Sequence, residues 1–133
     1  MSEMSDMPTR TVAILVVEDD PSVGELLGTV LKDVPGWTAT VAHDAAMARS
    51  VFQQVEIDML VIDINLPGIT GLELLNQLRG EPTWRAPAVI LMSAVEDQPG
   101  VREALATSMA ARFIAKPMNL DDLVGAIRET VDR

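Results

Sequence analysis

Two apolar runs that each end in acidic residues place the strongest constraint on this chain. Val12–Val17 leads directly into the acidic stretch 18–20, and Met59–Ile62 leads into Asp63. An apolar run is buried in a folded protein, whereas a carboxylate resists burial. The pattern therefore predicts two buried strands that carry their acids to one rim of a sheet. Two carboxylates about 4 Å apart repel by about 4 kcal/mol at an effective dielectric of about 20, so such a cluster needs a cation, a proton or a chemical role.

Several segments have the composition of strands, and the main ones are apolar throughout rather than alternating. Continuous apolar strands are typical of a parallel sheet that is covered on both faces. The expected strands are Val12–Val17, Met59–Ile62, Ala88–Met92 and Arg112–Ala115, with Trp37–Ala42 as a weaker, alternating strand at an edge.

Helical patterns occupy the gaps between these strands. The expected helices run from Pro21 to Asp33 behind an Asp20 N-cap, from an Asp44 cap through Met47, Val51 and Val55, from the Thr70–Glu73 capping box to Gly80, from Gly100 to about Ser108, and from an Asn119 cap to Val131. The alternation predicts an α/β fold, a doubly wound five-stranded parallel sheet in the order 2-1-3-4-5 with helices on both faces. In such a sheet ligands bind outside the carboxyl ends of the strands, at the switch point that strands one and three flank, and both acidic ends lie there.

The bulk composition restricts the class of protein. A chain of 133 residues, 48% hydrophobic, is expected to form one domain over residues 11–133 behind a flexible tail of residues 1–10. The net charge of −10 argues against a nucleic-acid partner and an anionic membrane surface, and its simplest meaning is solubility. The absence of cysteine excludes disulfides and thiolate metal sites. No apolar run is long enough to span a bilayer and the N-terminus lacks a signal-peptide pattern, so we expect a cytoplasmic protein.

The ends of the remaining strands complete the chemistry of the rim. Ser93 follows the fourth apolar run and Lys116 follows the fifth, which adds a hydroxyl and a cation. Carboxylate oxygens suit Mg²⁺, whereas a zinc site is not expected in a chain with a single histidine. We interpret this histidine, His43, as a solvated side chain. Asp20 could be a further metal ligand, but the N-cap role is favoured. The rim therefore offers a metal site, a nucleophilic carboxylate, a hydroxyl and an ammonium. This set of groups is complementary to a phosphoryl group.

From Thr11 to Val131 the chain resembles a response-regulator receiver domain of two-component signalling, which is chemotaxis-regulator-like and has a flavodoxin-like fold. The matching motifs are Ile14–Pro21, Val61–Asp63 with Pro67 and Gly68, Met92–Ala94, and Lys116 with Pro117. Each motif is weak alone, but the four occur in the right order at the predicted strand ends. Chance agreement of all four is small.

The resemblance implies that Asp63 is a phosphoacceptor, which takes a phosphoryl group from a partner's phosphohistidine with the help of Mg²⁺ or Mn²⁺. Glu18 and Asp19 match the acidic pair that binds the metal together with Asp63. The backbone carbonyl of Asn65 matches a further metal ligand. Lys116 matches the lysine that pairs with a phosphoryl oxygen.

The resemblance also implies a conformational switch. Ser93 matches the hydroxyl that moves toward the acyl phosphate, Phe113 matches the aromatic side chain that turns inward with it, and the bond before Pro117 is expected to be cis. The chain departs from the usual family residues, because Glu18 stands in place of aspartate, Phe113 in place of tyrosine and Ser93 in place of threonine. These departures affect the strength of the switch rather than the phosphorylation chemistry. Phe113 could alternatively be ordinary core packing.

The partners follow from the same resemblance. The donor is expected to be a histidine kinase or a histidine phosphotransfer protein, and a downstream protein target is expected on the face formed by the fourth helix, fifth strand and last helix, through which a homodimer could also form. The chain is expected to be a phosphoacceptor, not an enzyme. The alternative is a phosphorylation-independent interaction module of the same fold. A small-molecule aspartyl-phosphate hydrolase would need aspartate where Asn65 stands, and a flavin phosphate would be repelled by the acids at 18–20.

Overall fold

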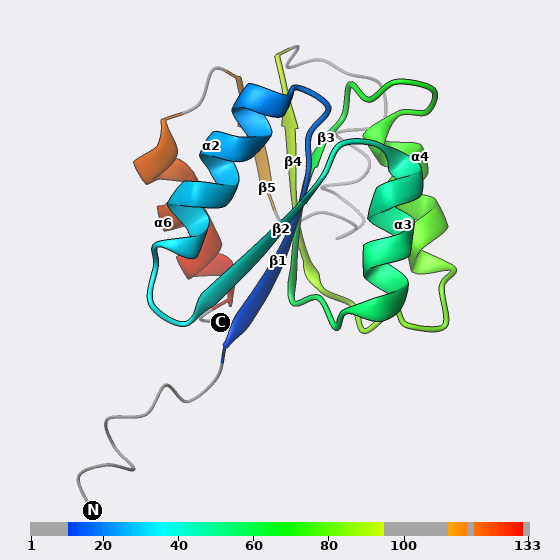
Figure 1. Ribbon diagram of the computed structural model, residues 1–133, viewed down its shortest axis with the longest axis horizontal. Coiled ribbons are helices and arrows are strands. Elements are labelled where there is room, and N and C mark those ends of the chain that lie inside the picture. Colours follow the sequence, from blue (N-terminus) through cyan, green and yellow to red (C-terminus); the bar gives the residue numbers. More distant parts are fainter. Residues whose placement is uncertain (1–10, 95–111, 117–118, 132–133) are drawn as a thin grey trace, which may run out of the picture.

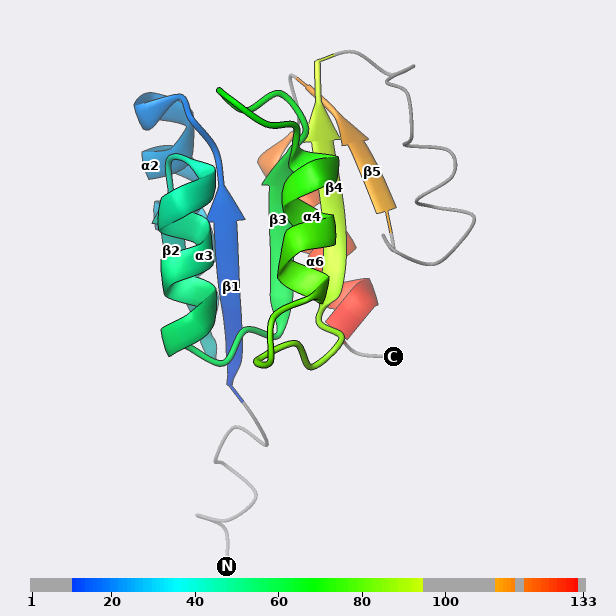
Figure 2. The same ribbon diagram turned by 90° about the vertical axis from the view of Figure 1, so that its right-hand side faces the viewer.

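The computed structural model describes residues 11–94, 112–116 and 119–131, and its centre is a five-stranded parallel sheet. The strands are β1 Val12–Val17, β2 Trp37–Ala42, β3 Met59–Asp63, β4 Ala88–Ser93 and β5 Arg112–Ala115. They lie in the order β2-β1-β3-β4-β5, which can be followed from left to right in Figure 2. The predicted order 2-1-3-4-5 is confirmed.

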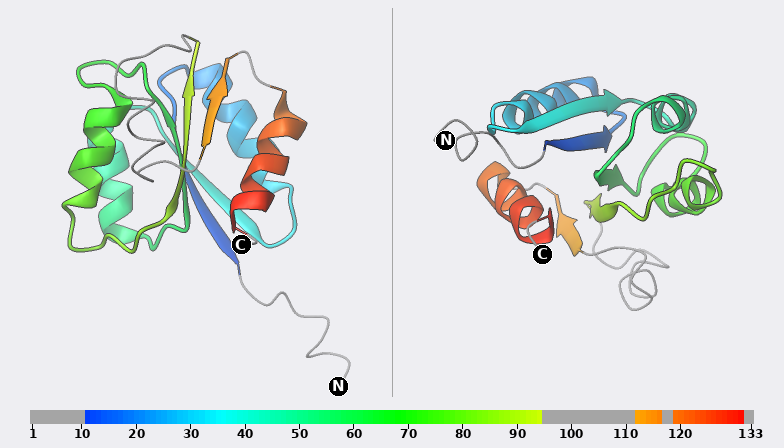
Figure 3. Two further views of the ribbon diagram at one scale, coloured as in Figure 1. Left: turned by 180° about the vertical axis from the view of Figure 1, so that it is seen from behind. Right: turned by 90° about the horizontal axis from the view of Figure 1, so that it is seen from below.

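Helices cover both faces of this sheet, as predicted. The described helices are α2 Pro21–Lys32, α3 Ala45–Gln54, α4 Gly71–Arg79 and α6 Leu120–Val131. The pair α2 and α6 lies on one face and the pair α3 and α4 on the other (Figures 1 and 3). None of the helices in the described part of the chain has the length and apolar character needed to cross a membrane. The helix expected from Gly100 to Ser108 and the tail of residues 1–10 fall outside the described residues.

The apolar strands serve two hydrophobic cores, one on each face. Successive strand residues point to opposite faces, so Leu15 packs toward α3 and α4 while Ile14 and Val16 pack toward α2 and α6. The same alternation separates Leu60 from Val61 in β3. A strand buried on both faces cannot alternate with polar residues, which explains the continuous apolar runs in the sequence.

Two strands extend one residue further than the apolar runs predicted. Asp63 is the last residue of β3 and Ser93 the last residue of β4. The sheet pairs Asp63 with Met92 and Ser93 with Ala115, so both polar residues belong to the strand ladder. Their backbones are therefore held by the sheet rather than by a loop.

Capping residues start the helices close to the edge of the sheet that the carboxyl ends of the strands form. Asp20 Oδ1 accepts hydrogen bonds from the backbone N–H groups of Ser22 at 2.9 Å and Val23 at 3.2 Å, which is the N-cap role that the sequence favoured. The capping box between Thr70 and Glu73 is present in both directions. Asp44 and Asn119 likewise accept backbone hydrogen bonds at the starts of α3 and α6.

The buried face of α3 differs from the prediction. Met47 and Val55 are 43% and 42% exposed, whereas Ala48 and Phe52 are buried. Phe52 packs against Trp84, with ring centroids 6.0 Å apart, and Val55 lies past the end of the helix in extended backbone. Val51, by contrast, is partly buried against the same core as predicted, because only packing against the sheet decides which apolar side chains of a helix are covered.

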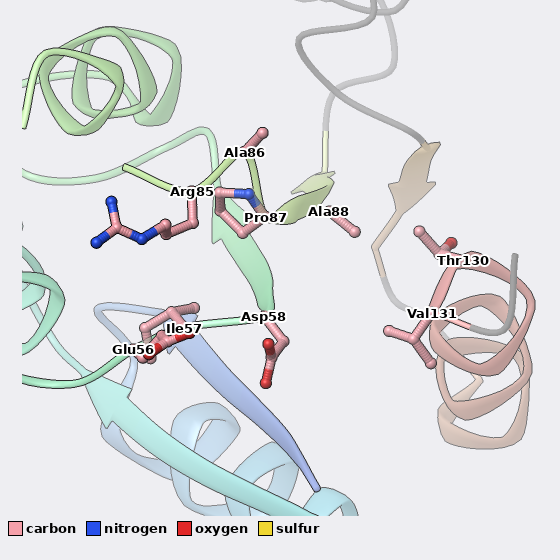
Figure 4. Close-up of a pocket in the computed structure, with 9 residues that line it drawn as sticks. All are labelled: Glu56, Ile57, Asp58, Arg85, Ala86, Pro87, Ala88, Thr130 and Val131. Carbon is pink, nitrogen blue, oxygen red and sulfur yellow. The ribbon is translucent and has the colours of Figure 1, made fainter. Parts of the chain in front are cut away.

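The lower edge of the sheet, opposite the acidic strand ends, carries a pocket of about 300 Å³ (Figure 4). Asp58, Arg85 and, from the end of α6, Val131 are among the residues that line it. The Asp58 carboxylate accepts a hydrogen bond from the Ala13 N–H at 2.8 Å, and the Asp58 carbonyl accepts one from the Ala88 N–H at 3.1 Å. Asp58 therefore ties together the starts of β1, β3 and β4 and has a structural role at this edge.

Candidate functional site

Three charged side chains from distant parts of the chain meet at the carboxyl ends of the strands. The Lys116 ammonium nitrogen lies 2.5 Å from Glu18 Oε1 and 2.7 Å from Asp63 Oδ2. The residues follow or end β1, β3 and β5, whose upper ends lie at one edge because all strands are parallel. The structure thus brings together the two acidic strand ends and the lysine that the sequence marked.

Burial makes this cluster electrostatically demanding. Glu18 is 1% exposed and Asp63 is 3% exposed, so water screens little of their mutual repulsion. Burial raises the pKa of Glu18 above its usual value, the negative charge of Asp63 raises it further, and the hydrogen bond from Lys116 offsets part of the rise. Burial alone would lower the pKa of Lys116, but its hydrogen bonds to Asp63 and Glu18 outweigh this, and the pKa is raised. The ammonium therefore remains charged and compensates the two acids.

The Asp63 carboxylate is held at both oxygens. Oδ1 accepts a hydrogen bond from the backbone N–H of Asn65 at 2.9 Å, while Oδ2 accepts one from Lys116. The position of the carboxylate is thereby set by the backbone as well as by a charge. A nucleophile with a preset orientation needs little reorganisation before it reacts.

The acidic residues at this edge fit a hard divalent cation. Glu18, Asp19 and Asp63 each offer a carboxylate oxygen, and these oxygens lie within 4.8 Å of one another. Asp19 is exposed while the other two are buried, so the cluster is open to solvent on one side. An all-oxygen set of one exposed and two buried carboxylates matches the ligand preference of Mg²⁺, which keeps some of its waters for other ligands.

Ser93 lies beside the acids at the end of β4. It is fully buried, and its hydroxyl oxygen accepts a hydrogen bond from the side-chain amide of Asn65 at 3.1 Å. Its backbone carbonyl accepts a hydrogen bond from the Lys116 N–H at 2.8 Å. Ser93 is therefore connected to both the loop after β3 and the end of β5.

Gly71 is a residue of this site that the sequence reasoning missed. A Cβ atom at this position would lie 2.4 Å from the backbone oxygen of Asp63, and the Gly71 N–H donates to the Ile64 carbonyl at 2.8 Å. Helix α4 thus begins in direct contact with the end of β3, which only a glycine permits. The signal in the sequence is a glycine directly after the Thr70 cap, where glycine is otherwise a poor helix former.

His43 also has a closer relation to the site than expected. Its side chain is exposed, but Nδ1 lies 3.1 Å from the Glu18 backbone oxygen, so the imidazole is not simply solvated. The register pairs Val17 with Ala42, so the residues that follow these two are neighbours. The strand order predicted from the sequence contains this information, but a single histidine in a predicted loop gives no direct signal.

Of the two remaining predicted features, the structure describes the position of Phe113 but not the peptide bond before Pro117. Phe113 is partly buried and packs against the core that α3 and α4 share with the sheet. Pro117 lies outside the described residues, and so does the helix that would flank β5 on the expected partner face.

Comparison with protein-family models matches residues 14–128 to the response regulator receiver domain. Curated relatives include the transcriptional regulatory protein TrcR of Mycobacterium tuberculosis, which is 34% identical over 92% of this chain and 46% of its own length. The DNA-binding response regulator MtrA of Mycolicibacterium smegmatis is 30% identical over 96% of this chain and 54% of its own length. The chain therefore spans about half the length of these relatives.

Solved structures have the same fold. A CheY-like receiver domain protein from Methanospirillum hungatei superposes with a TM-score of 0.81 at 23% identity, covering 92% of this chain and 94% of that one. The response regulator TrrA of Thermotoga maritima, solved in complex with Mg²⁺ and BeF, superposes with a TM-score of 0.74 at 28% identity, covering 90% of this chain and 99% of that one.

Proposed function

Since this chain belongs to the response regulator receiver domain family, we propose that Asp63 is the residue on which it accepts a phosphoryl group. The observation that carries the proposal is the position of Asp63, a residue that is 3% exposed and whose carboxylate is held between the Asn65 N–H and the Lys116 ammonium. A carboxylate fixed in this way at the edge of a parallel sheet can present one oxygen to an incoming phosphorus atom. Proteins of this family are signalling phosphoacceptors rather than enzymes that turn over separate substrates.

The transfer needs the charges of both reactants to be neutralised. Carboxylate oxygens of Glu18, Asp19 and Asp63, with the backbone carbonyl of Asn65, would hold Mg²⁺, and Mn²⁺ is the alternative ion. When bound, the ion supplies positive charge to the phosphoryl oxygens. An oxygen of Asp63 attacks the phosphorus of a phosphohistidine, the P–N bond breaks, and the imidazole leaves with the bonding electron pair and takes up a proton. Lys116 is placed to pair with a phosphoryl oxygen after the transfer.

Phosphorylation gives two residues new partners. The phosphoryl group adds negative charge and acceptor oxygens at Asp63. Ser93 can donate its hydroxyl to one of these oxygens, and Lys116 can pair with another. Contacts that exist in only one state shift the equilibrium between two conformations. We assign Phe113, which is partly buried against the core, as the aromatic side chain that turns inward when Ser93 moves.

The proposed phosphoryl donor is a histidine kinase or a histidine phosphotransfer protein. The proposed output is altered binding of a downstream protein through the surface around β5 and α6. The receiver would bind this target either as a single chain or as a homodimer. The relatives named above are described as transcriptional or DNA-binding regulators. We therefore restrict the expectation of no nucleic-acid or membrane contact to the 133 residues of this chain, whose net charge is −10. We place this chemistry in the cytoplasm.

Intact-mass measurement after incubation with Mg²⁺ and acetyl phosphate tests the proposal. We expect one phosphoryl adduct on the natural protein and none on Asp63→Asn. The matched control is Asp33→Asn, because Asp33 is an exposed acid at the end of α2 and should leave the adduct unchanged. No adduct with acetyl phosphate or with a phosphorylated histidine donor would instead favour the phosphorylation-independent interaction module.

A further inference from the structure

We propose that the side-chain amide of Asn65 is a positioning group that holds the Ser93 hydroxyl in the unphosphorylated state. Release of this hydrogen bond would then be part of the switch, and residue 65 would set how readily the protein adopts its phosphorylated conformation. This inference rests on the proposed function. It assigns the Asn65 side chain a role separate from that of its backbone carbonyl, which is the proposed metal ligand.

The contact joins an exposed residue to a buried one. Asn65 Nδ2 donates to Ser93 Oγ at 3.1 Å, and Ser93 is 0% exposed. Asn65 itself is exposed, so its amide reaches inward from the surface of the loop after β3. Breaking a buried hydrogen bond without a replacement costs free energy, so this contact persists until another group takes its place.

The loop that carries Asn65 is fixed independently of its side chain. The Asn65 N–H donates to Asp63 Oδ1 at 2.9 Å, and the Ile64 carbonyl accepts from Leu66 at 3.2 Å and from Gly71 at 2.8 Å. A substitution at residue 65 therefore removes the amide while the backbone contacts remain. The two roles of the residue can be separated by experiment.

Because residue 93 is a serine, a hydrogen bond from Asn65 can determine the orientation of its hydroxyl. Serine has no branch at Cβ, so its χ1 angle is less restricted than that of threonine. An external donor can therefore decide which rotamer is populated. The hydrogen bond from Asn65 favours one position of Oγ in the unphosphorylated protein, and the turn of χ1 by which Ser93 donates its hydroxyl to a phosphoryl oxygen on Asp63 would carry Oγ away from Asn65.

Titration with beryllofluoride at saturating Mg²⁺, followed by calorimetry and by the amide resonance of Ser93, tests the inference. Asn65→Ala removes a contact made only in the free state, so it should bind beryllofluoride more tightly, on the order of fivefold for a neutral hydrogen bond. Without beryllofluoride, its Ser93 resonance should move toward the bound position. Asn76→Ala, at an exposed asparagine of α4, is the matched control and should bind like the natural protein.

A double-mutant cycle shows whether the effect passes through the hydroxyl. In a Ser93→Ala background, Asn65→Ala should produce no further gain. Weaker binding by Asn65→Ala would mean that the amide contacts the phosphoryl analogue instead, and unchanged binding or an equal gain without Ser93 would also overturn the inference. Failure of the natural protein to bind beryllofluoride would overturn the proposed function itself, and this inference with it.

Discussion

The Lys116 ammonium lies 2.5 Å from the Glu18 carboxylate, although 98 positions separate the two residues in the sequence. Glu18 is also one of the three acids whose oxygens cluster at the edge of the sheet. The same carboxylate therefore serves an internal ion pair and the proposed cation site. We therefore expect the Lys116 ammonium and a bound divalent cation both to interact with the Glu18 carboxylate.

Replacing Lys116 with methionine should destabilise the metal-free protein. The substitution leaves Glu18 and Asp63 buried side by side without compensation, and losing one partner of a buried ion pair costs roughly 3 kcal/mol. Added Mg²⁺ should recover part of this loss, because it supplies charge to the same acids. Urea unfolding with and without Mg²⁺ measures both effects. Lys32→Met, at an exposed residue ending α2, should change neither, and equal losses for the two variants would contradict the expectation.

The raised pKa of Glu18 should appear in the pH dependence of stability. A carboxyl group with a higher pKa in the folded state stabilises the fold below its unfolded value of 4.5, and this contribution is lost as the pH rises through the folded pKa. In the absence of Mg²⁺, the natural protein should therefore lose stability relative to Glu18→Gln as the pH rises from about 4 to 7, by about 1.4 kcal/mol per unit of pKa elevation. Denaturant unfolding at several pH values measures the difference. Parallel curves for the two proteins would refute the assignment.

Gly71→Ala should disturb the site through the backbone. Its Cβ would lie 2.4 Å from the Asp63 carbonyl oxygen, so α4 or the end of β3 must shift, at a cost of about 1–3 kcal/mol. Phosphorylation by acetyl phosphate should also slow, because the shifted backbone carries Asp63, the proposed phosphoacceptor. Gly125→Ala in α6 is the control, since its Cβ meets nothing within 4 Å. This variant should be neutral or more stable by up to about 1 kcal/mol, reflecting helix propensity.

The corrected face of α3 can be tested by comparing two truncations. Phe52→Ala should cost about 3–5 kcal/mol, because it empties a buried site against Trp84. Met47→Ala should stay within about 0.5 kcal/mol of the natural protein, since this side chain is 43% exposed. Thermal or urea unfolding of both variants gives the answer. The face predicted from the sequence would be supported instead if the Met47 variant were the less stable one.

Helix faces show where prediction from sequence is limited. The N-caps at Asp20, Asp44 and Thr70 were predicted correctly because a cap depends on residues within one turn. The apolar face of α3 was predicted correctly at Val51 but wrongly at Met47, because Met47 and Phe52 are both apolar and only packing against the sheet decides between them. A pattern of residue types can predict that a helix has a buried face more securely than it predicts which apolar side chains fill it.

The amino-acid sequence by itself determined the strands, their order and the edge at which the acids, Ser93 and Lys116 lie. These features depend on local burial patterns, capping and the handedness of strand connections, which act over short stretches of chain. Only the tertiary structure decided that Lys116 reaches Glu18 as well as Asp63, that Asn65 contacts Ser93, and that Gly71 lies against β3. Such contacts depend on differences of about an ångström between backbones, and register, twist and side-chain packing of the whole sheet fix these distances.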